Sequence, residues 1–467
     1  AVAHPREYFV AVDGADSNDG SLHRPFSTIQ RAADLMRPGD ICHIRSGVYR
    51  QVIRPNRSGT QGRPISFEAW PGEVVILLGT EPLAAEWSVH EGAIYKTKVP
   101  SEFDQLFVDG QMMIEARWPN MRFDQRFDKS CWATAGEGSE YGTMVDPELA
   151  KTGIDWTGAV GTLNVGSWQT YRRFVRDHRA GGDSFTYERN MPGHVPPKRK
   201  WEGFDHYYLS GKLEALDTPT EWHLDRENLT LYLWTDDGRS PAGRNVEVKV
   251  RDYAFEAKKK QFIELKGLHF FGATFKFESC SDCVVENCHL SFPTWAERLG
   301  PAAQTLLHGS RNVMRDCSVV FGDGPGVVAR GEQNTLDNCL VHDVDFNALD
   351  RGHGVSFSSS AKSAVRHCTI FNSGGSEGLT VSGRGPSIVE YNYIFNGGLL
   401  QSDGGLIQCS GINLNNTVIR YNWVHDHNAF NWGGIGIRGD DLTRNPVSYT
   451  HLRAHETSLH LVCRLLL

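Results

Sequence analysis

The sequence predicts an all-β protein, namely a right-handed, single-stranded parallel β-helix with an N-terminal capping helix and an inserted β-rich domain. Two strand patterns recur every 22 to 30 residues and advance together along the chain. The recurrence stops between residues 81 and 248. Coils of short strands that stack about 4.8 Å apart explain both patterns, and an insertion explains the interruption.

The first pattern is a short alternation of apolar and polar residues followed by turn residues, which is typical of a strand. It occurs as VVENCHL, VMRDCSV, TLDNCLV, AVRHCTI, IVEYNYI and VIRYNWV. We expect one aligned position in each unit to point inward, giving a ladder of small side chains that ends in two amides bonded to backbone. This ladder consists of Cys288, Cys317, Cys339, Cys368, Asn392 and Asn422.

The stretch CSDCVVENCH, from Cys280 to His289, also offers the thiolate and imidazole ligands that zinc prefers. Because the same cysteine position recurs in later coils, we predict a packed ladder and no metal site. Cys280 and Cys283 lie outside the ladder and have no predicted role. Ten cysteines in an exported protein suggest disulfides, but cysteines one coil apart serve packing, so we predict mostly free thiols.

The second pattern is an apolar strand that begins directly after a glycine, as in GVVAR, GVSFS, GLTVS, GLIQC and GIGIR. The steps between these strands are 28, 24, 27 and 29 residues, close to the steps of the first pattern. Two strand columns that share one step are typical of a parallel β-helix. The leading glycines are Gly326, Gly354, Gly378, Gly405 and Gly434.

The N-terminal segment YFVAVDGADSNDGSLHRPFSTIQRAADLMRPGDICHIRSGVYRQVI reads as a strand, a turn, an amphipathic helix and a first coil. We expect the helix at Ser27 to Met36, with Ser27 as N-cap and an apolar face that plugs the open end of the β-helix. The segment is similar to the opening of many secreted carbohydrate-active parallel β-helix proteins. The expected apolar face consists of Ile29, Ala32, Ala33 and Met36.

The interrupted region contains DQLFVDGQMMIEARWPN and EWHLDRENLTLYLWTDDG, which are typical of hairpins with Asp-Gly turns. These segments resemble the inserted domain of parallel β-helix glycoside hydrolases of the xylosidase and fucosidase kind, and polysaccharide lyases are more distant. Between them, WQTYRRF and PPKRKWEGFDHYY mix aromatic residues with Arg and Lys. Such a mixture either binds carboxylated or sulfated sugars or forms a solvated loop with packed aromatics.

The chain divides into an N-terminal cap with the first coils at 1–80, the inserted β-rich domain at 81–248, further β-helix coils at 249–445 and a tail at 446–467. The tail reads PVSYTHLRAHETSLHLVCRLLL, which resembles the conceptual translation of a sequencing adapter joined to a truncated gene. We therefore expect the tail to be artefactual and to play no part in function.

Composition limits the partners that this chain can have. The formal net charge of -8 argues against nucleic acid as the main partner. No apolar run of about 18 residues is present, so we predict no membrane span. The opening AVAHPREYF has the small residues of a secretory cleavage site, which favours a secreted or periplasmic bacterial protein.

Polar residues gather in the turn directly before each glycine-led strand, and such turns lie close together in successive coils. Glu377 and Asp403 occupy neighbouring turns, which implies a separation near 5 Å and suits a retaining glycosidase. Repulsion is expected to raise one of the two pKa values and make that group the acid. His353 lies in the same column and is a third catalytic candidate. Candidates for contacts with the sugar are Asp350, Arg351, Gln401 and Trp432.

The alternative for each carboxylate is a structural one, because Asp in these turns commonly bonds its own backbone. Asp440 follows the last glycine-led strand, in GIGIRGDD. The resemblance to β-helix xylosidases implies catalytic roles for Asp403 and Asp440, by position only. Arg438 is a further candidate for substrate binding.

His427 is also a candidate for substrate binding. It follows His425 and Asp426, which could be a base with its orienting carboxylate, or metal ligands. Because His342 and Asp343 recur at the same offset from the first pattern, we expect a repeated turn instead.

The leading functional hypothesis is glycoside hydrolysis of a polysaccharide or oligosaccharide by a carboxylate pair, with no cofactor. The alternative is a polysaccharide lyase, which needs cations or calcium to neutralise a uronate. A non-catalytic sugar-binding protein is a third possibility on the same fold. The lyase alternative depends on Arg351, Lys362, Arg384 and Arg438.

Overall fold

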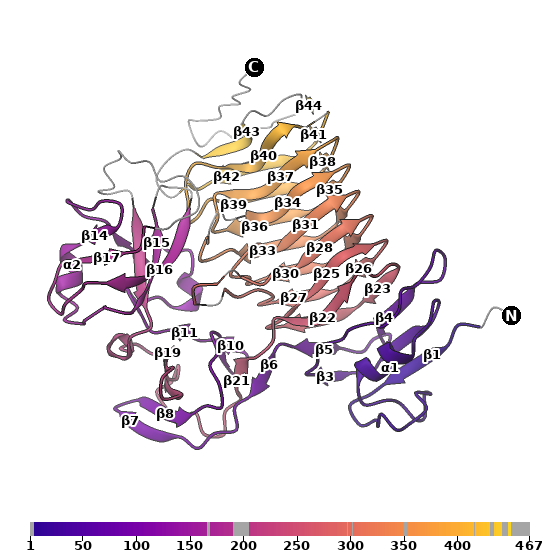
Figure 1. Cartoon of the computed structure of the whole chain (residues 1–467), viewed down its shortest axis with the longest axis horizontal. Coiled ribbons are helices and arrows are strands. Elements are labelled where there is room, and N and C mark those ends of the chain that lie inside the picture. Colours follow the sequence, from indigo (N-terminus) through magenta and orange to yellow (C-terminus); the bar gives the residue numbers. More distant parts are fainter. Residues whose placement is uncertain are drawn as a thin grey trace.

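The computed structural model shows a parallel β-helix with a β-rich insertion at its side (Figure 1). It describes residues 4–165, 169–189, 205–296, 298–300, 302–349, 353–414, 416–429, 434–440 and 447–449. Three long sheets, here called I, II and III, run along the β-helix, and each coil adds a parallel strand to each of them. The predicted fold class is confirmed. In the described part of the chain, no helix has the length and apolar character needed to cross a membrane.

Sheet I has eleven strands, sheet II nine and sheet III eight. Sheet I contains β1 (Glu7–Val10), β2 (Ile41–Ile44), β4 (Ile65–Ala69), β23 (Ile263–Lys266), β26 (Val284–Glu286), β29 (Val313–Arg315), β32 (Thr335–Asp337), β35 (Ala364–Arg366), β38 (Ile388–Glu390), β41 (Val418–Arg420) and β44 (Val447–Tyr449). Sheet II contains β3 (Gly47–Tyr49), β5 (Val75–Leu78), β24 (Leu268–Phe271), β27 (His289–Ser291), β30 (Ser318–Val320), β33 (Leu340–Val344), β36 (Thr369–Ser373), β39 (Tyr393–Gly397) and β42 (Trp423–His427). Sheet III contains β22 (Tyr253–Lys258), β25 (Thr274–Ser281), β28 (Leu306–Ser310), β31 (Val327–Glu332), β34 (His353–Ala361), β37 (Glu377–Arg384), β40 (Gly405–Asn413) and β43 (Ile435–Asp440).

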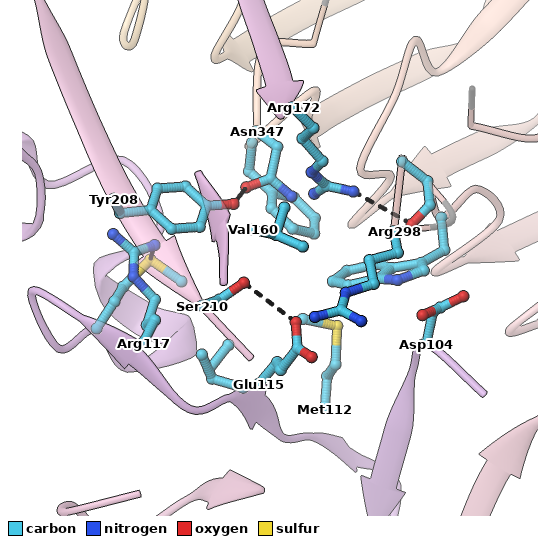
Figure 2. Close-up of a pocket in the computed structure, with 15 residues that line it drawn as sticks. Asp104, Met112, Glu115, Arg117, Val160, Arg172, Tyr208, Ser210, Arg298 and Asn347 are labelled. Carbon is cyan, nitrogen blue, oxygen red and sulfur yellow. Dashed lines mark hydrogen bonds between the residues drawn. The ribbon is translucent and has the colours of Figure 1, made fainter. Parts of the chain in front are cut away.

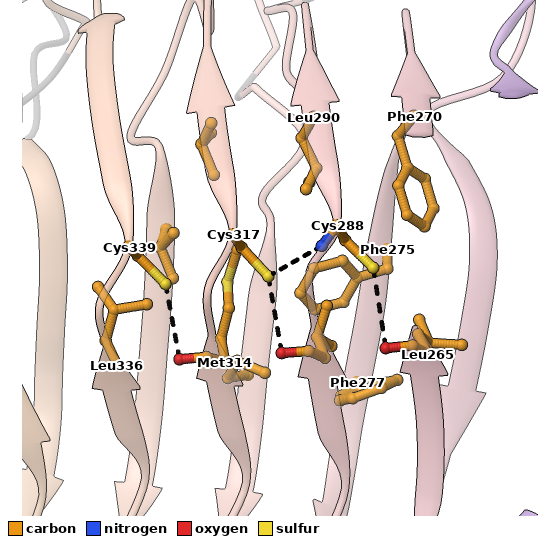
Figure 3. Close-up of a cluster of buried hydrophobic side chains, with 14 of the residues drawn as sticks. Leu265, Phe270, Phe275, Phe277, Cys288, Leu290, Met314, Cys317, Leu336 and Cys339 are labelled. Atoms are coloured by element: carbon orange, nitrogen blue, oxygen red, sulfur yellow. Dashed lines mark hydrogen bonds between the residues drawn. The ribbon is translucent and has the colours of Figure 1, made fainter. Parts of the chain in front are cut away.

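The cysteine ladder lies between sheets I and II, in the interior of the β-helix (Figure 3). Its four thiols are at most 3% exposed and each contacts a backbone carbonyl, as Cys317 Sγ does with Val285 O at 3.6 Å. The amide of Asn392 continues the ladder and accepts a 2.9 Å hydrogen bond from the Cys368 N–H. The ladder prediction is therefore confirmed. All nine cysteines in the described residues are free and buried.

Cys283, which had no predicted role, begins a second ladder at the turn between sheets III and I. In each coil a backbone N–H donates to a side-chain oxygen of the next coil, beginning with Cys283 N to Asn312 Oδ1 at 3.2 Å. This ladder was not predicted, because its members change from cysteine to amide to hydroxyl along the chain. They are Cys283, Asn312, Asn334, Ser363, Ser387 and Thr417.

The capping helix α1 (Ile29–Leu35) lies at the N-terminal end of the β-helix and buries Ile29, Ala32 and Ala33. Its N-cap is Thr28, whose hydroxyl accepts from the Arg31 N–H at 3.2 Å, so the prediction of Ser27 was wrong. The Ser27 hydroxyl instead donates to the Asp16 carboxylate at 2.9 Å.

The insertion leaves the β-helix after β5 and returns at β22. Because β4 pairs directly with β23 and β5 with β24, the coils continue across it without a break. Its first sheet contains β6 (Thr80–Pro82), β9 (Leu106–Val108), β10 (Gln111–Met112) and β21 (Val246–Lys249). Its second sheet contains β7 (Ser88–Glu91), β8 (Ile94–Lys98), β11 (Ile114–Glu115), β19 (Glu221–Asp225) and β20 (Thr230–Trp234). Its third sheet contains β12 (Arg117–Trp118), β13 (Ala133–Thr134), β14 (Thr143–Val145), β15 (Val160–Asn164), β16 (Thr170–Arg176), β17 (Ser184–Tyr187) and β18 (His206–Ser210). Its short helices are α2 (Pro147–Ala150), η1 (Phe123–Gln125), η2 (Lys129–Cys131) and η3 (Leu213–Ala215).

Both predicted hairpins are present as β9–β10 and β19–β20. The first turns at Asp109 and Gly110, which have φ of 51° and 79°. The second turns at residues 226–229 instead, because Asp237 and Gly238 come after β20. At the other end of the chain, Val447–Tyr449 forms β44 and pairs with β41, although we assigned these residues to an artefactual tail.

Candidate active site

A groove of about 590 Å³ lies between the outer face of sheet III and strand β16 of the insertion. The β-helix side is formed by β31, β34 and the loops before β28 and β31. The described residues that line it are Thr170, Tyr171, Arg172, Arg173, Leu299, Gly300, Ala302, Gln304, Gly324, Pro325, Val328, Arg330, Leu349, His353, Ser356 and Ser358. Of the turns before glycine-led strands, those before β31 and β34 border this groove, and His353 is the only predicted site residue among the described residues that line it.

The parallel register of sheet III brings polar residues of successive coils side by side. Ser356 of β34 lies next to Thr380 of β37, which lies next to Gln408 of β40. Gln408 in turn lies next to Arg438 of β43. The interior positions between them, such as Val355 and Leu379, are apolar and buried, so the alternation of each strand directs the polar side chains outward.

His353 and Glu377 are register partners at the start of β34 and β37. The His353 Nδ1 lies 2.5 Å from the Glu377 carboxylate, and both side chains are less than one fifth exposed. The Thr380 hydroxyl contacts the same ring nitrogen at 2.9 Å and also donates to the Glu377 carboxylate. This cluster joins a carboxylate, an imidazole and a hydroxyl, which are groups that can exchange a proton.

Asp403 lies in the turn before β40 and has a different partner. Its carboxylate accepts a 2.7 Å hydrogen bond from the Arg438 guanidinium, which also donates to the Asp403 carbonyl at 2.8 Å. The β37–β40 register pairs Leu379 with Ile407, so Glu377 falls beside Gly405 and not beside Asp403. Asp403 lies in the turn before β40, with a left-handed φ of 62°, so the two acids are not register partners, and the expected separation near 5 Å stays a prediction.

Two other predicted residues hold the fold around this site. Gln401 is fully buried and its amide donates to the Thr170 hydroxyl of the insertion at 3.1 Å, so it joins the insertion to the β-helix and does not face a substrate. The His427 Nε2 contacts the Ser376 carbonyl at 2.9 Å, directly before Glu377. Burial lowers the pKa of His427, which favours its neutral form.

The His-Asp pair that we expected to repeat does repeat, but within strands β42 and β33 and not in turns. The His425 Nδ1 contacts the Asp426 carboxylate at 2.8 Å, as the His342 Nδ1 contacts Asp343 at 2.6 Å. Both aspartates are left-handed, with φ of 56° and 53°.

The remaining predicted residues cannot be placed in the site. Asp440 ends β43, where its backbone pairs with Ser410, but its side chain lies outside the described residues. Asp350, Arg351 and Trp432 also lie outside the described residues.

Three arginines that line the groove were not among the individually predicted site residues. Arg172 and Arg173 lie on β16, in the segment WQTYRRF, which the aromatic and basic composition had singled out. Arg330 lies on β31 and carried no sequence signal, because its position in the groove depends on how the insertion docks. In the lyase alternative, Lys362 lies in the turn after β34, Arg438 pairs with Asp403, and the side chain of Arg384 is not described.

A smaller pocket of about 60 Å³ adjoins the groove through Arg172 (Figure 2). Arg172 donates to the Ala296 carbonyl at 3.3 Å and lies 3.7 Å from the buried Asp323 carboxylate. Across the pocket, the Tyr208 hydroxyl donates to Asn347 at 2.6 Å, and Ser210 donates to Glu115 at 3.2 Å. The contacts of Arg172 and Tyr208 fix the insertion against the loops of the β-helix, whereas the Ser210–Glu115 bond lies within the insertion.

The described residues contain no cluster of side chains that could bind a metal ion. Among them, no three His, Cys, Asp or Glu side chains lie close enough together to share a metal ion. The CSDCVVENCH cysteines each contact backbone groups of the β-helix instead.

Comparison with known proteins supports the fold. A family model described as a right-handed β-helix region matches residues 305–462, including part of the segment that we assigned to an artefactual tail. The uncharacterized protein YwoF of Bacillus subtilis is 33% identical over 79 residues, which are 17% of this chain and 17% of that protein. Pectate lyase PEL9 of Emericella nidulans is 34% identical over 77 residues, which are 16% of this chain and 19% of that protein. The matches thus span less than a fifth of these relatives.

Two solved structures resemble most of the chain. A glycoside hydrolase superposes with a TM-score of 0.72 at 16% identity, covering 95% of this chain and 92% of that one. XylC, solved in complex with xylose, superposes with a TM-score of 0.58 at 14% identity, covering 95% of this chain and 68% of that one. At this identity the likeness shows a shared fold.

Proposed function

We propose that this chain hydrolyses glycosidic bonds of a poly- or oligosaccharide in the groove between sheet III and the insertion. The observation that carries the proposal is the cluster formed by His353, which lines the groove, with Glu377 and Thr380 behind it and a second carboxylate, Asp403, one coil further along. A groove open along several coils suits an extended sugar chain. The fold shared with a glycoside hydrolase supports the same reaction class.

Glycoside hydrolysis needs one carboxyl group that protonates the leaving oxygen and one carboxylate that acts as nucleophile or base. Glu377 suits the first role because its proton can be shared with the imidazole and the hydroxyl that contact it. Asp403 suits the second role because the Arg438 guanidinium holds it in one orientation as an anion. This mechanism requires no cofactor.

A second candidate is β-elimination from a uronate polymer. It is favoured by the contact between His353 Nδ1 and Glu377, which leaves the other ring nitrogen to act as base, and by the arginines of the groove, which could neutralise a uronate. Calcium is a possible cofactor only under this candidate. Under either reaction we propose a secreted or periplasmic location, because polysaccharide substrates lie outside the cell.

The deciding experiment incubates the protein with plant and algal polysaccharides and follows reducing ends and the ultraviolet absorbance of unsaturated uronates together. Hydrolysis produces reducing ends without absorbance. A parallel rise of both signals would reject hydrolysis in favour of elimination. If neither signal appears with any polymer, while oligosaccharides still bind, the chain is a sugar-binding protein and both enzymatic proposals fail.

A further inference from the structure

The charge of the groove is opposite to that of the whole protein. The chain has a formal net charge of -8, but the described residues that line the groove include Arg172, Arg173, Arg330 and no aspartate or glutamate. Low-dielectric walls strengthen the field of such groups, and because Arg172 lies 3.7 Å from the buried Asp323 carboxylate, the attraction for anions depends mainly on Arg330.

Arg330 differs from the other arginines on the outside of the β-helix. Five of those pair with a carboxylate of the neighbouring coil, at distances from 2.6 to 3.1 Å. In the part of the chain that the structure describes, no carboxylate lies within ion-pair distance of the Arg330 guanidinium, although its side chain is exposed in the groove. The five paired arginines are Arg311, Arg315, Arg366, Arg420 and Arg438.

The opposite wall supplies a second cation. Arg173 of β16 lines the groove, and its Nη1 donates to the Arg172 carbonyl at 2.7 Å, which fixes its direction. Its guanidinium carbon lies 5.6 Å from the centre of the Tyr171 ring, which also lines the groove. A planar guanidinium binds two oxygens of a carboxylate or sulfate at once.

We infer that the groove selects a sugar that carries a carboxylate or a sulfate, with Arg330 as the specificity-determining cation and Arg173 facing it from the insertion. Ser356 and Ser358 lie on the same wall as Arg330 and can bond sugar hydroxyls. The inference rests on the proposed function, because it names the class of substrate for the same groove.

The test measures binding by calorimetry with two matched pairs of probes. One pair is oligogalacturonate and its methyl ester, and the other is a sulfated galactan oligosaccharide and its desulfated form. We expect one charged probe to bind at least about tenfold more tightly than its neutral partner, and its affinity to fall with added salt. The pair that shows the difference identifies carboxylate or sulfate.

Variants assign the effect to Arg330. Arg330→Gln should weaken binding of the charged probe roughly ten- to hundredfold and leave the neutral probe unchanged, while Arg330→Lys retains part of the preference. Arg37→Gln is the matched control, since this exposed arginine lies beside α1, away from the groove. Equal binding within both pairs, a preference unaffected by Arg330→Gln, or no binding of either charged probe would overturn the inference.

The same samples keep the two proposals apart. Cleavage of neutral sugars without a charge preference rejects the inference and leaves the proposed hydrolysis standing. Charge-selective binding without any cleavage rejects the proposed hydrolysis and leaves the inference standing.

Discussion

His353 and Glu377 face each other across adjacent strands of sheet III, with Nδ1 2.5 Å from the carboxylate. Each is the first residue of its strand, directly before the leading glycine, and the parallel register makes them partners. An imidazole held through one nitrogen by a carboxylate has a fixed orientation, and the carboxylate has a fixed proton partner. Because His353 lines the groove, this contact connects Glu377 to any bound sugar.

Replacing Glu377 with Gln should reduce the rate of glycosidic cleavage by roughly 100- to 10,000-fold, because the amide cannot transfer a proton. The amide keeps the shape and can still accept from Thr380, so the thermal unfolding midpoint should change little. Rates on the best polymer of the panel give the first value, and calorimetry gives the second.

The matched control is Glu390→Gln, which removes a carboxylate bound to Arg420 on the outside of sheet I. It should retain the full rate. If Glu377→Gln also retains the full rate while the protein is active, the proposed acid is wrong.

Asp403→Asn tests whether this aspartate is catalytic or a turn residue. Asn tolerates the left-handed backbone of Asp403 and can still accept from Arg438, so the fold should lose less than about 1 kcal/mol of unfolding free energy. The rate should fall at least roughly 100-fold, because the negative charge is lost.

Asp426→Asn is the control for Asp403, since it changes another left-handed aspartate, with φ of 56°, which lies on β42 and is exposed. Equal activity of the two variants would assign Asp403 to the turn alone. Urea unfolding and initial rates on one preparation of each variant decide between the readings.

Much of the β-helix could be predicted because its strand patterns recur at a regular interval along the sequence. Cys288, Cys317 and Cys339 recur at the coil step, and stacking forces equal positions of successive coils into one column. The same reasoning placed His353 and Glu377 together, since both open glycine-led strands.

The rest of the site depends on contacts between the insertion and the β-helix, which the regular spacing of the strands does not reveal. Arg330 lines a groove only because β16 of the insertion docks beside sheet III, more than a hundred residues away in the chain. Asp403 lies in the turn before β40, where the strand register does not fix its position relative to Glu377. Gln401 looked like a groove residue in sequence but is buried by the docked insertion.

The cysteines should be unreactive in the native protein. All nine in the described residues are buried, and burial raises the pKa of Cys409 to about 12, so little thiolate is present at pH 8. Mass spectrometry after brief alkylation should find these nine thiols unmodified, and alkylation in guanidinium chloride should modify all of them. Rapid native labelling of Cys317 or Cys339 would contradict the packed ladder.

Glu221 should make the stability of the protein depend on pH. Its carboxyl is fully buried in β19, and desolvation raises its pKa from 4.5 to about 9. The unfolded chain ionises this group above about pH 4.5, while the folded chain keeps it protonated. Stability from this group is therefore complete below pH 4.5 and is lost as pH rises toward 9.

Glu221→Gln should remove this dependence, with little effect at pH 4.5 and a gain on the order of a few kcal/mol at pH 8.5. Glu227→Gln, in the exposed turn of the same hairpin, serves as the control. Urea unfolding at both pH values measures the difference. An equal effect of Glu221→Gln at the two pH values would show that the folded chain ionises Glu221 normally.

Asn392 should contribute more to stability than the cysteines that precede it in the ladder. Its side chain accepts from the Cys368 N–H at 2.9 Å and donates to the Val365 carbonyl at 2.9 Å, both inside the β-helix. Asn392→Ala leaves these buried backbone groups without partners and should cost roughly 2–4 kcal/mol of unfolding free energy.

The matched control is Cys339→Ala, which removes only packing and a weak thiol contact, so about 1 kcal/mol is expected. Asn392→Cys, which restores the residue type of the earlier coils, should fall between the two in urea unfolding. If Asn392→Ala costs no more than Cys339→Ala, the amide acts in the ladder by its size and not by its hydrogen bonds.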